Sequence, residues 1–227
     1  MFETSSQDKM YKEILSTNVD QELLDWTKTK TLEFQKMLTY YRCAIKEVET
    51  KFRVLDEEHS LQNDRNPISV IKVRLKSVPS IMEKLQRKGY PFSLQSIEEN
   101  IHDVAGIRVV CSFERDVYTL AKALLNQDDI VLISKKDYIK NPKPNGYRSL
   151  HLIVQIPIFL ETEKKQMKVE IQLRTIAMDC WASLEHQLRY KKGKQFTDEM
   201  SEALLRCSQL STDMDKEMDR LREESGI

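Results

Sequence analysis

Glycine is scarce in this sequence, with five residues in a chain of 227. There is no Gly-x-x-x-x-Gly-Lys-Ser/Thr phosphate loop and no Gly-x-Gly-x-x-Gly dinucleotide motif. The Gly-x-Ser-x-Gly turn that carries the nucleophile of many hydrolases is missing as well. Any phosphate group bound by this protein must therefore be held by side chains rather than by a glycine-rich backbone cradle.

Cysteine and long apolar runs are also rare. The four cysteines lack a Cys-x-x-Cys pair and a His partner at zinc spacing, so we interpret them as reduced and mostly buried thiols of a cytoplasmic protein. The first ten residues are polar and lack the apolar segment of a signal peptide. Because the longest apolar run, Leu150 to Leu160, is interrupted by Gln155 and Pro157, we expect no membrane span.

Net charge is absent too, since 36 Lys and Arg residues balance 36 Asp and Glu residues. This balance argues against a protein whose whole surface binds nucleic acid, so an anion site must be a local cluster of cations. The apolar fraction of 40% is typical of a globular protein. The length favours one domain with room for a helical extension.

Hydrophobic periodicity divides the chain into helices and strands. Steps of four and three predict long helices over 20–58 and 198–222, and shorter ones over 77–89, 116–126 and 176–190. In the helix over 176–190, we expect Trp181, Leu184 and Leu188 to be buried. Period-two alternation or short β-branched runs predict strands near 71–76, 107–113, 130–134, 147–158 and 169–174. Residues 135–146 are expected to form a loop.

This order of elements predicts an α+β fold, in which a mixed β-sheet is flanked by helices and helical arms lie at both ends. We divide the chain into an N-terminal helical arm (1–64), a core (65–192) and a C-terminal helix (193–227). The apolar stripe of each arm has two explanations: the arm packs on its own domain, or it forms contacts between subunits. We favour an oligomerisation role for the C-terminal helix.

Polar side chains alternate with the apolar ones on three of the predicted strands. If these polar faces meet in one cleft, it combines several cations, two carboxylates and an aromatic ring. Its members would be Arg74, Lys76, Asp103, Arg108, Tyr147, His151, Glu170, Gln172 and Arg174. Cations neutralise phosphates, one or two carboxylates hold Mg²⁺ beside phosphate oxygens, and a ring stacks on a base. The cluster therefore indicates a site for a nucleotide polyphosphate with a divalent ion.

Each member also has an ordinary structural explanation when taken alone. A basic strand face is more often solvated than functional, Asp103 is consistent with a turn, and His151 with a partly buried histidine. Taken together they favour a site, because a charged inner face would otherwise oppose folding. The residues by themselves do not choose adenine over guanine, or pyrophosphoryl transfer over nucleotidyl transfer.

Four sequence blocks resemble the synthetase domain of the RelA/SpoT alarmone enzymes, which has a nucleotidyltransferase-like fold. They are DVAGIR from Asp103, DYIKNPKPNGYRSLH from Asp137, VEIQLRT from Val169 and WASLEH from Trp181. The resemblance covers roughly 65–192 with consistent order and spacing, and the second block is the most specific. Because the chain lacks the hydrolase and regulatory regions of the long members, it is similar to the small alarmone synthetases. The long N-terminal helix is typical of the RelP-like branch.

The resemblance implies a (p)ppGpp synthetase of the stringent response, which moves the β,γ-pyrophosphate of ATP to the 3′-hydroxyl of GDP or GTP and releases AMP. Asp103 and Glu170 would hold Mg²⁺, and Glu170 could also accept the 3′-hydroxyl proton. Arg74 and Arg108 would sandwich adenine. The donor phosphates would lie along Lys76, Ser80, Lys84 and Arg87. Tyr147 would stack on guanine, and the other residues of the guanosine nucleotide site would be Lys136, Lys143, Asn145, His151 and Gln172.

Two positions depart from the family pattern: relatives often carry Gly at the position of Val73 and Asn at that of Asp179. The second lies near the guanine site and bears on acceptor preference, and the choice among GMP, GDP and GTP stays open. The family also implies a cytoplasmic homotetramer. RNA binding stays open as an added regulatory activity.

Two other readings compete with a synthetase. A nucleotidyltransferase would use a similar carboxylate pair but release pyrophosphate. A non-catalytic module would bind RNA or regulatory nucleotides, and it would have no need of the Asp103 and Glu170 pair.

Overall fold

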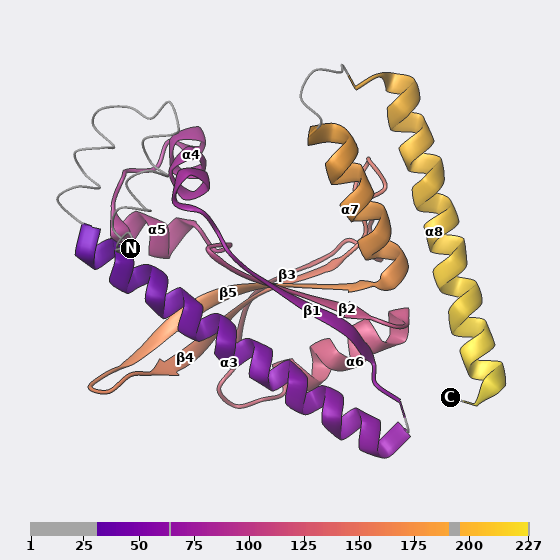
Figure 1. The fold of residues 1–227 in the computed structure, drawn as a ribbon, viewed down its shortest axis with the longest axis horizontal. Helices are drawn as coiled ribbons and strands as arrows, with labels where there is room; N and C mark the ends of the chain where they lie inside the picture. The colour runs from indigo at the N-terminus through magenta and orange to yellow at the C-terminus, as the bar shows by residue number, and fades with distance from the viewer. Residues whose placement is uncertain (1–30, 64, 191–195, 227) are drawn as a thin grey trace, which may run out of the picture.

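A computed structural model describes residues 31–63, 65–190 and 196–226 (Figure 1). Five strands form one sheet in the order β1-β2-β5-β4-β3. Their bounds are Ile68–Leu75 (β1), Ala105–Cys111 (β2), Val131–Asp137 (β3), Leu150–Phe159 (β4) and Lys164–Thr175 (β5). The pair β2 and β5 is parallel and the other three neighbouring pairs are antiparallel, so the predicted mixed sheet is confirmed.

The helices lie on both sides of this sheet. Their bounds are Thr31–Asn63 (α3), Val78–Lys88 (α4), Leu94–Asn100 (α5), Glu114–Leu125 (α6), Ile176–Tyr190 (α7) and Asp198–Ser225 (α8). Helices α3 and α6 pack on one face of the sheet. Helices α4 and α5 lie at one end of the molecule, and α7 and α8 at the other, with α8 outermost (Figure 1). The α+β class with helical arms is therefore confirmed.

The apolar face of the sheet and α3 form the core. Ile107, Ile171 and Leu152 are register neighbours on β2, β5 and β4, and each is at most 2% exposed. Helix α3 places Phe34 and Phe52 among the buried residues of this core, as the four-three stripe predicts. Each such side chain contributes about 1.5–3 kcal/mol when it leaves water. This core fixes which face of the sheet stays open.

Several predicted boundaries are confirmed by the capping geometry. The hydroxyl of Ser77 accepts a hydrogen bond from the amide of Ser80 at the start of α4. Gly89 ends the same helix with φ 68°, a left-handed conformation that favours glycine. The expectations for residues 20–30 and for a helix end at Gly193 lie outside the described residues. In the described part of the chain, no helix has both the length and the apolar character needed to cross a bilayer.

Other predictions were wrong. Leu184 and Leu188 are 52% and 50% exposed, because α7 turns Ala177, Met178 and Trp181 toward the protein instead. Strand β3 continues to Asp137 through residues predicted as loop, and Tyr147 lies in a loop before β4 rather than in the strand. Helix α5 was not predicted, since its seven residues are too short to show a clear period.

Candidate active site

The open face of the sheet carries a row of polar side chains that crosses all five strands. Its members are paired in the strand register in the order Lys72, Arg108, Gln172, His151 and Lys136. These side chains share one face because each strand contributes the residue directly opposite its neighbour. The sequence prediction that the polar faces of separate strands meet is therefore confirmed.

A second row lies beside the first and contains the catalytic candidate Glu170. In this row Arg74 pairs with Gly106, and Gly106 pairs with Glu170 across the parallel β2–β5 ladder. Because glycine has no side chain, the sheet surface is open between the arginine and the carboxylate. This gap forms the floor of a hollow.

Two hollows meet at the carboxylates of Asp103 and Glu170. The first has a volume of about 360 Å³, and its other walls include Lys72, Arg74 and Arg108. The second has a volume of about 330 Å³, and Asp103 and Glu170 line it as well. Its remaining polar and aromatic lining includes Lys84, Lys136, Tyr138, Lys143 and His151. Two cation-rich hollows that share a pair of acids can hold two anionic molecules side by side.

Asp103 sits two residues before β2 and is paired with two lysines. Lys84 Nζ donates to one carboxylate oxygen at 2.7 Å, and Lys76 Nζ donates to the other at 3.1 Å. Burial favours the neutral acid, but these two ammonium groups outweigh it and hold the pKa of Asp103 below its ordinary value. The Asp103 carboxylate is therefore charged at neutral pH.

Glu170 is fixed by two neighbours on the open face. Gln172 Nε2 donates to Glu170 Oε2 at 3.0 Å, and His151 Nδ1 lies 3.6 Å from Glu170 Oε1. Burial again favours the neutral acid, but contact with His151 and then with Gln172 lowers the pKa of Glu170 below its ordinary value. An ionised carboxylate in a partly buried cleft can accept a proton or bind a cation.

Aromatic and basic side chains gather around the second hollow. The Tyr138 ring lies edge-on to His151 with centroids 5.3 Å apart, and the Tyr147 ring does so at 5.7 Å. Lys143 Nζ lies 4.7 Å from the centre of the Tyr138 ring and 4.8 Å from that of Tyr147. A base entering here can stack on a ring while its phosphates contact lysines.

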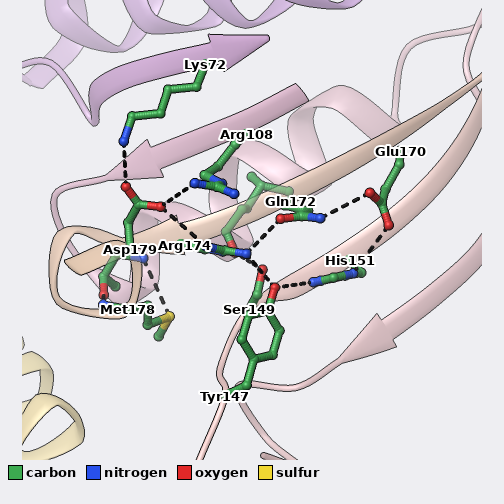
Figure 2. A network of polar contacts seen from close by, with 12 residues as sticks. Lys72, Arg108, Tyr147, Ser149, His151, Glu170, Gln172, Arg174, Met178 and Asp179 are labelled. Carbon is green, nitrogen blue, oxygen red and sulfur yellow. Dashed lines mark hydrogen bonds and ion pairs between the residues drawn. The ribbon is translucent and has the colours of Figure 1, made fainter. Parts of the chain in front are cut away.

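Asp179 is the centre of a cation network beside the first hollow, whose lining residues Lys72 and Arg108 it contacts (Figure 2). Its carboxylate accepts hydrogen bonds from Lys72 at 2.8 Å, Arg108 at 3.0 Å and Arg174 at 3.3 Å. Arg174 also donates to the Tyr147 hydroxyl at 2.5 Å. Although burial opposes its charge, Lys72 and Arg108 hold the pKa of Asp179 below its ordinary value. The network links a wall of the first hollow to the ring of Tyr147.

Five residues of the predicted site do not line either hollow: Ser80, Arg87, Asn145, Tyr147 and Arg174. Ser80 lies in the first turn of α4, where its hydroxyl accepts a hydrogen bond from Ser77 at 2.9 Å. Arg87 is exposed in the last turn of α4. Asn145 contacts Glu185 of α7 at 3.5 Å. Tyr147 contacts His151, which lines the second hollow, so Tyr147 borders that hollow without lining it.

Sequence reasoning missed Lys72 and Tyr138 as lining residues. The alternation of β1 placed Lys72 on the same face as Arg74 and Lys76, so that signal was available. Tyr138 lies in a loop, where no periodicity indicates the direction of a side chain.

Comparisons with known proteins fit this geometry. Residues 73–195 match the family described as the region found in RelA / SpoT proteins. The GTP pyrophosphokinase YwaC of Bacillus subtilis (strain 168) is 45% identical over 184 residues, which cover 79% of this chain and 88% of that protein. The GTP pyrophosphokinase YjbM of the same strain is 35% identical over 192 residues, covering 85% and 90%.

A solved structure is similar over nearly its whole length. The small alarmone synthetase 1 from Bacillus subtilis, bound to its product pppGpp, has a TM-score of 0.77 and 35% identity to this chain. The match covers 85% of this chain and 97% of that one.

Proposed function

This chain belongs to the RelA/SpoT family, and we propose that the two hollows meeting at Asp103 and Glu170 are the donor and acceptor sites of a small alarmone synthetase. The chain is a GTP pyrophosphokinase, which transfers the β,γ-pyrophosphate of ATP to the 3′-hydroxyl of GDP or GTP and releases AMP. The observation that carries the assignment of sites is the shared carboxylate pair. A transfer between two nucleotides needs their reacting atoms in contact, and two adjoining hollows provide that arrangement.

The first hollow is the site for ATP. Arg74 and Arg108 lie on adjacent strands in its wall, where two guanidinium planes can enclose adenine. Lys76 is directed toward the shared acids, as its bond to Asp103 shows, and so lies where the phosphates of ATP must reach. Ser80 and Arg87 on α4 extend the same donor site, and Lys84 of α4 reaches Asp103, where the two hollows meet.

The second hollow is the site for the guanosine nucleotide. Lys136, Lys143 and His151 supply donors and positive charge for its phosphates. Tyr147 stacks on guanine, with Asn145 as a further polar neighbour, and Tyr138 adds a second ring. Gln172, expected at the guanosine nucleotide, lines the first hollow and contacts the second through its bond to Glu170.

Asp103 and Glu170 fit Mg²⁺, because a pair of ionised carboxylate oxygens beside a phosphate site is the donor set that this ion takes in nucleotide enzymes. When bound there, Mg²⁺ would neutralise charge on the transferred group. Lys76 and Lys84 balance the Asp103 carboxylate in the structure described here. Were the ion held on that carboxylate, Lys76 and Lys84 would be available to bind phosphate oxygens.

Glu170 accepts the proton of the attacking 3′-hydroxyl. Its lowered pKa keeps it ionised, and His151 and Gln172 hold the carboxylate from two sides. The new O–P bond forms at the β-phosphorus of ATP as the bond to the α-phosphate oxygen breaks. Alignment and charge neutralisation supply most of the rate acceleration, as in other phosphoryl transfers.

The assembly is a homotetramer, and α8 supports this part of the proposal. Its large apolar residues Met214, Met218 and Leu221 are nearly half exposed in the single chain, as are Leu184 and Leu188 of α7. Exposed large apolar side chains on two neighbouring helices are typical of a subunit interface. We place the enzyme in the cytoplasm, where its thiols stay reduced. The expectation that these thiols are mostly buried was wrong, since Cys180 and Cys207 are exposed.

The test is incubation with ATP and GDP, with and without Mg²⁺. We expect AMP and a guanosine with four phosphates to form only with the ion, and Glu170→Gln to abolish product while the circular dichroism spectrum is unchanged. Glu161→Gln, an exposed acid on the β4–β5 turn, is the matched control. Pyrophosphate release would indicate a nucleotidyltransferase instead, and normal turnover by Glu170→Gln would refute the role of this residue.

A further inference from the structure

The loop that carries Tyr147 is held from outside the sheet by the C-terminal helix. We call residues 138–149, between β3 and β4, the acceptor loop. Within this loop the amide of Gly146 donates to the carbonyl of Lys143 at 2.8 Å, which forms a tight turn immediately before Tyr147. Helix α8 contacts Gly146 and Arg148, the residues on either side of Tyr147. These two contacts fix the position of Tyr147.

The first contact joins Ser208 to Gly146. The Ser208 hydroxyl donates to the Gly146 carbonyl at 2.5 Å, and Ser208 is 6% exposed. A Cβ atom at Gly146 would lie 2.6 Å from Ser208 Cβ, so a side chain does not fit between the loop and the helix. Gly146 also has φ 89°, which favours glycine. The loop and α8 are therefore in direct contact at this point.

The second contact joins Asp215 to Arg148. Arg148 Nη1 donates to Asp215 Oδ2 at 2.9 Å, and Arg148 Nη2 donates to Glu114 of α6 at 2.6 Å. The side chains of Arg148 and Asp215 are each 6% exposed. Ser208 and Asp215 are two helical turns apart and therefore share one face of α8. This face holds the acceptor loop at both neighbours of Tyr147.

The inner face of α8 is polar, whereas several of its large apolar residues are about half exposed. The buried residues of the helix are Ser208, Asp215 and Arg222. Directional hydrogen bonds and ion pairs fix geometry more narrowly than apolar burial, because they weaken steeply with angle and distance. The inner face therefore determines the position of the acceptor loop more closely than an ordinary packed helix would.

We propose that α8 is a positioning element of the acceptor site, in which Ser208 and Asp215 hold Tyr147 in the orientation that binds the guanosine nucleotide. The inference rests on the proposed function, since it assumes that Tyr147 contacts guanine. Ser208 touches no substrate and acts through the Gly146 carbonyl. A free acceptor loop would still reach guanine, but it would have to be ordered on binding, and this ordering weakens affinity.

The test compares Ser208→Ala with Ser201→Ala in the full-length chain. The Ser201 hydroxyl donates within α8 to the carbonyl of Thr197 at 3.2 Å, so the control removes the same group from the same helix. For Ser208→Ala we expect the KM for GDP to rise about threefold to tenfold, the range that follows from one lost hydrogen bond. The KM for ATP and the unfolding midpoint of Ser208→Ala should stay close to those of Ser201→Ala.

A second pair of variants tests the contact from the other side. Gly146→Ala should raise the KM for GDP more than Ser208→Ala does, because its methyl group collides with Ser208. Adding Ser208→Gly removes the colliding atoms, so the double variant should bind GDP better than the sum of the two single effects predicts.

Four results separate a failure of the role of α8 from a failure of the proposed function. An unchanged KM for GDP in Ser208→Ala, or an equal rise in the KM for ATP, would overturn the role of α8. The role of α8 would also be overturned if the effects of Gly146→Ala and Ser208→Gly on the KM for GDP were strictly additive. Absence of AMP formation by the unmodified protein would instead count against the proposed function, so the two failures are distinguishable.

Discussion

The hydroxyl of Tyr147 lies 2.8 Å from Nε2 of His151, and Nδ1 of the same imidazole lies 3.6 Å from Glu170 (Figure 2). One imidazole therefore connects the ring proposed to stack on guanine with the carboxylate proposed to accept the 3′-hydroxyl proton. The two ends of the acceptor nucleotide are thus recognised by residues that hold one another in place. Binding of the base can orient the reacting end of the same nucleotide.

Replacing Tyr147 should separate the role of its ring from that of its hydroxyl. We expect Tyr147→Ala to raise the KM for GDP by one to two orders of magnitude, because a stacked base is worth about 1–3 kcal/mol. Tyr147→Phe keeps the ring and loses the bonds to His151 and Arg174, so its effect should be smaller. Steady-state kinetics with each substrate varied in turn measures both. Equal losses for ATP and GDP would contradict stacking on guanine.

Replacing Asp179 with Asn should affect both substrates. The change removes the charge that holds Arg108 beside the donor hollow and Arg174 beside Tyr147. We expect both Michaelis constants to rise about threefold to tenfold and the free energy of unfolding to fall by about 1–3 kcal/mol. Kinetics and urea unfolding measure these effects. A change confined to GDP would restrict Asp179 to the acceptor site, as the family resemblance implies.

Asp219 on α8 should destabilise the fold at neutral pH. Burial raises its pKa above the ordinary value, and Asp116 and Glu223 reinforce the shift against Arg222. A raised folded-state pKa means that stability is lost as pH rises through that pKa. We therefore expect Asp219→Asn to raise the free energy of unfolding at pH 7 by about 0.5 kcal/mol, a figure reduced for solvent screening.

The same variant has a pH signature. The difference in the free energy of unfolding between Asp219→Asn and the unmodified protein should shrink as pH falls through the raised pKa. It should disappear below about pH 3.9, where Asp is neutral in the unfolded chain too. Urea unfolding over a series of pH values measures the difference. A free energy of unfolding that is lower at pH 7 in Asp219→Asn than in the unmodified protein, with a loss that vanishes at low pH, would show that the pKa is lowered instead.

The outer face of α8 should determine assembly. Met214 and Met218 are each 49% exposed in the single chain, so replacing both with Glu should leave the fold intact and disrupt an apolar interface. We expect a lower mass by size-exclusion chromatography with light scattering. Lys216→Glu changes the net charge by the same amount at an exposed position between the two methionines. If both variants keep the assembly of the unmodified protein, the interface lies elsewhere.

Strand alternation was sufficient to predict which residues share the open face. Val169, Ile171 and Leu173 face the core, so Glu170 and Gln172 had to face the other way. Capping chemistry likewise predicted both ends of α4, since Ser77 and Gly89 have conformations that their residue types favour. These are local properties, and a single sequence contains them.

Features that depend on distant contacts were not predictable in the same way. Leu184 and Leu188 follow a helical stripe, but which side of α7 meets the sheet depends on where β5 ends. The contact between Ser208 and Gly146 joins segments far apart in the chain, and neither residue carries a pattern that indicates the other. The direction of Tyr138 is set by loop geometry for the same reason.

The parallel pairing of β2 with β5 also has a consequence for synthesis on the ribosome. Asp103 is synthesised just before β2, whereas Glu170 is part of β5, which pairs with β2. The ribosome must make four intervening segments between the two acids: α6, β3, the acceptor loop and β4. Closing such a long segment is entropically slow, so this ladder is expected to form late in folding. A nascent chain that stops before Lys164 therefore holds one acid of the pair and cannot release alarmone prematurely.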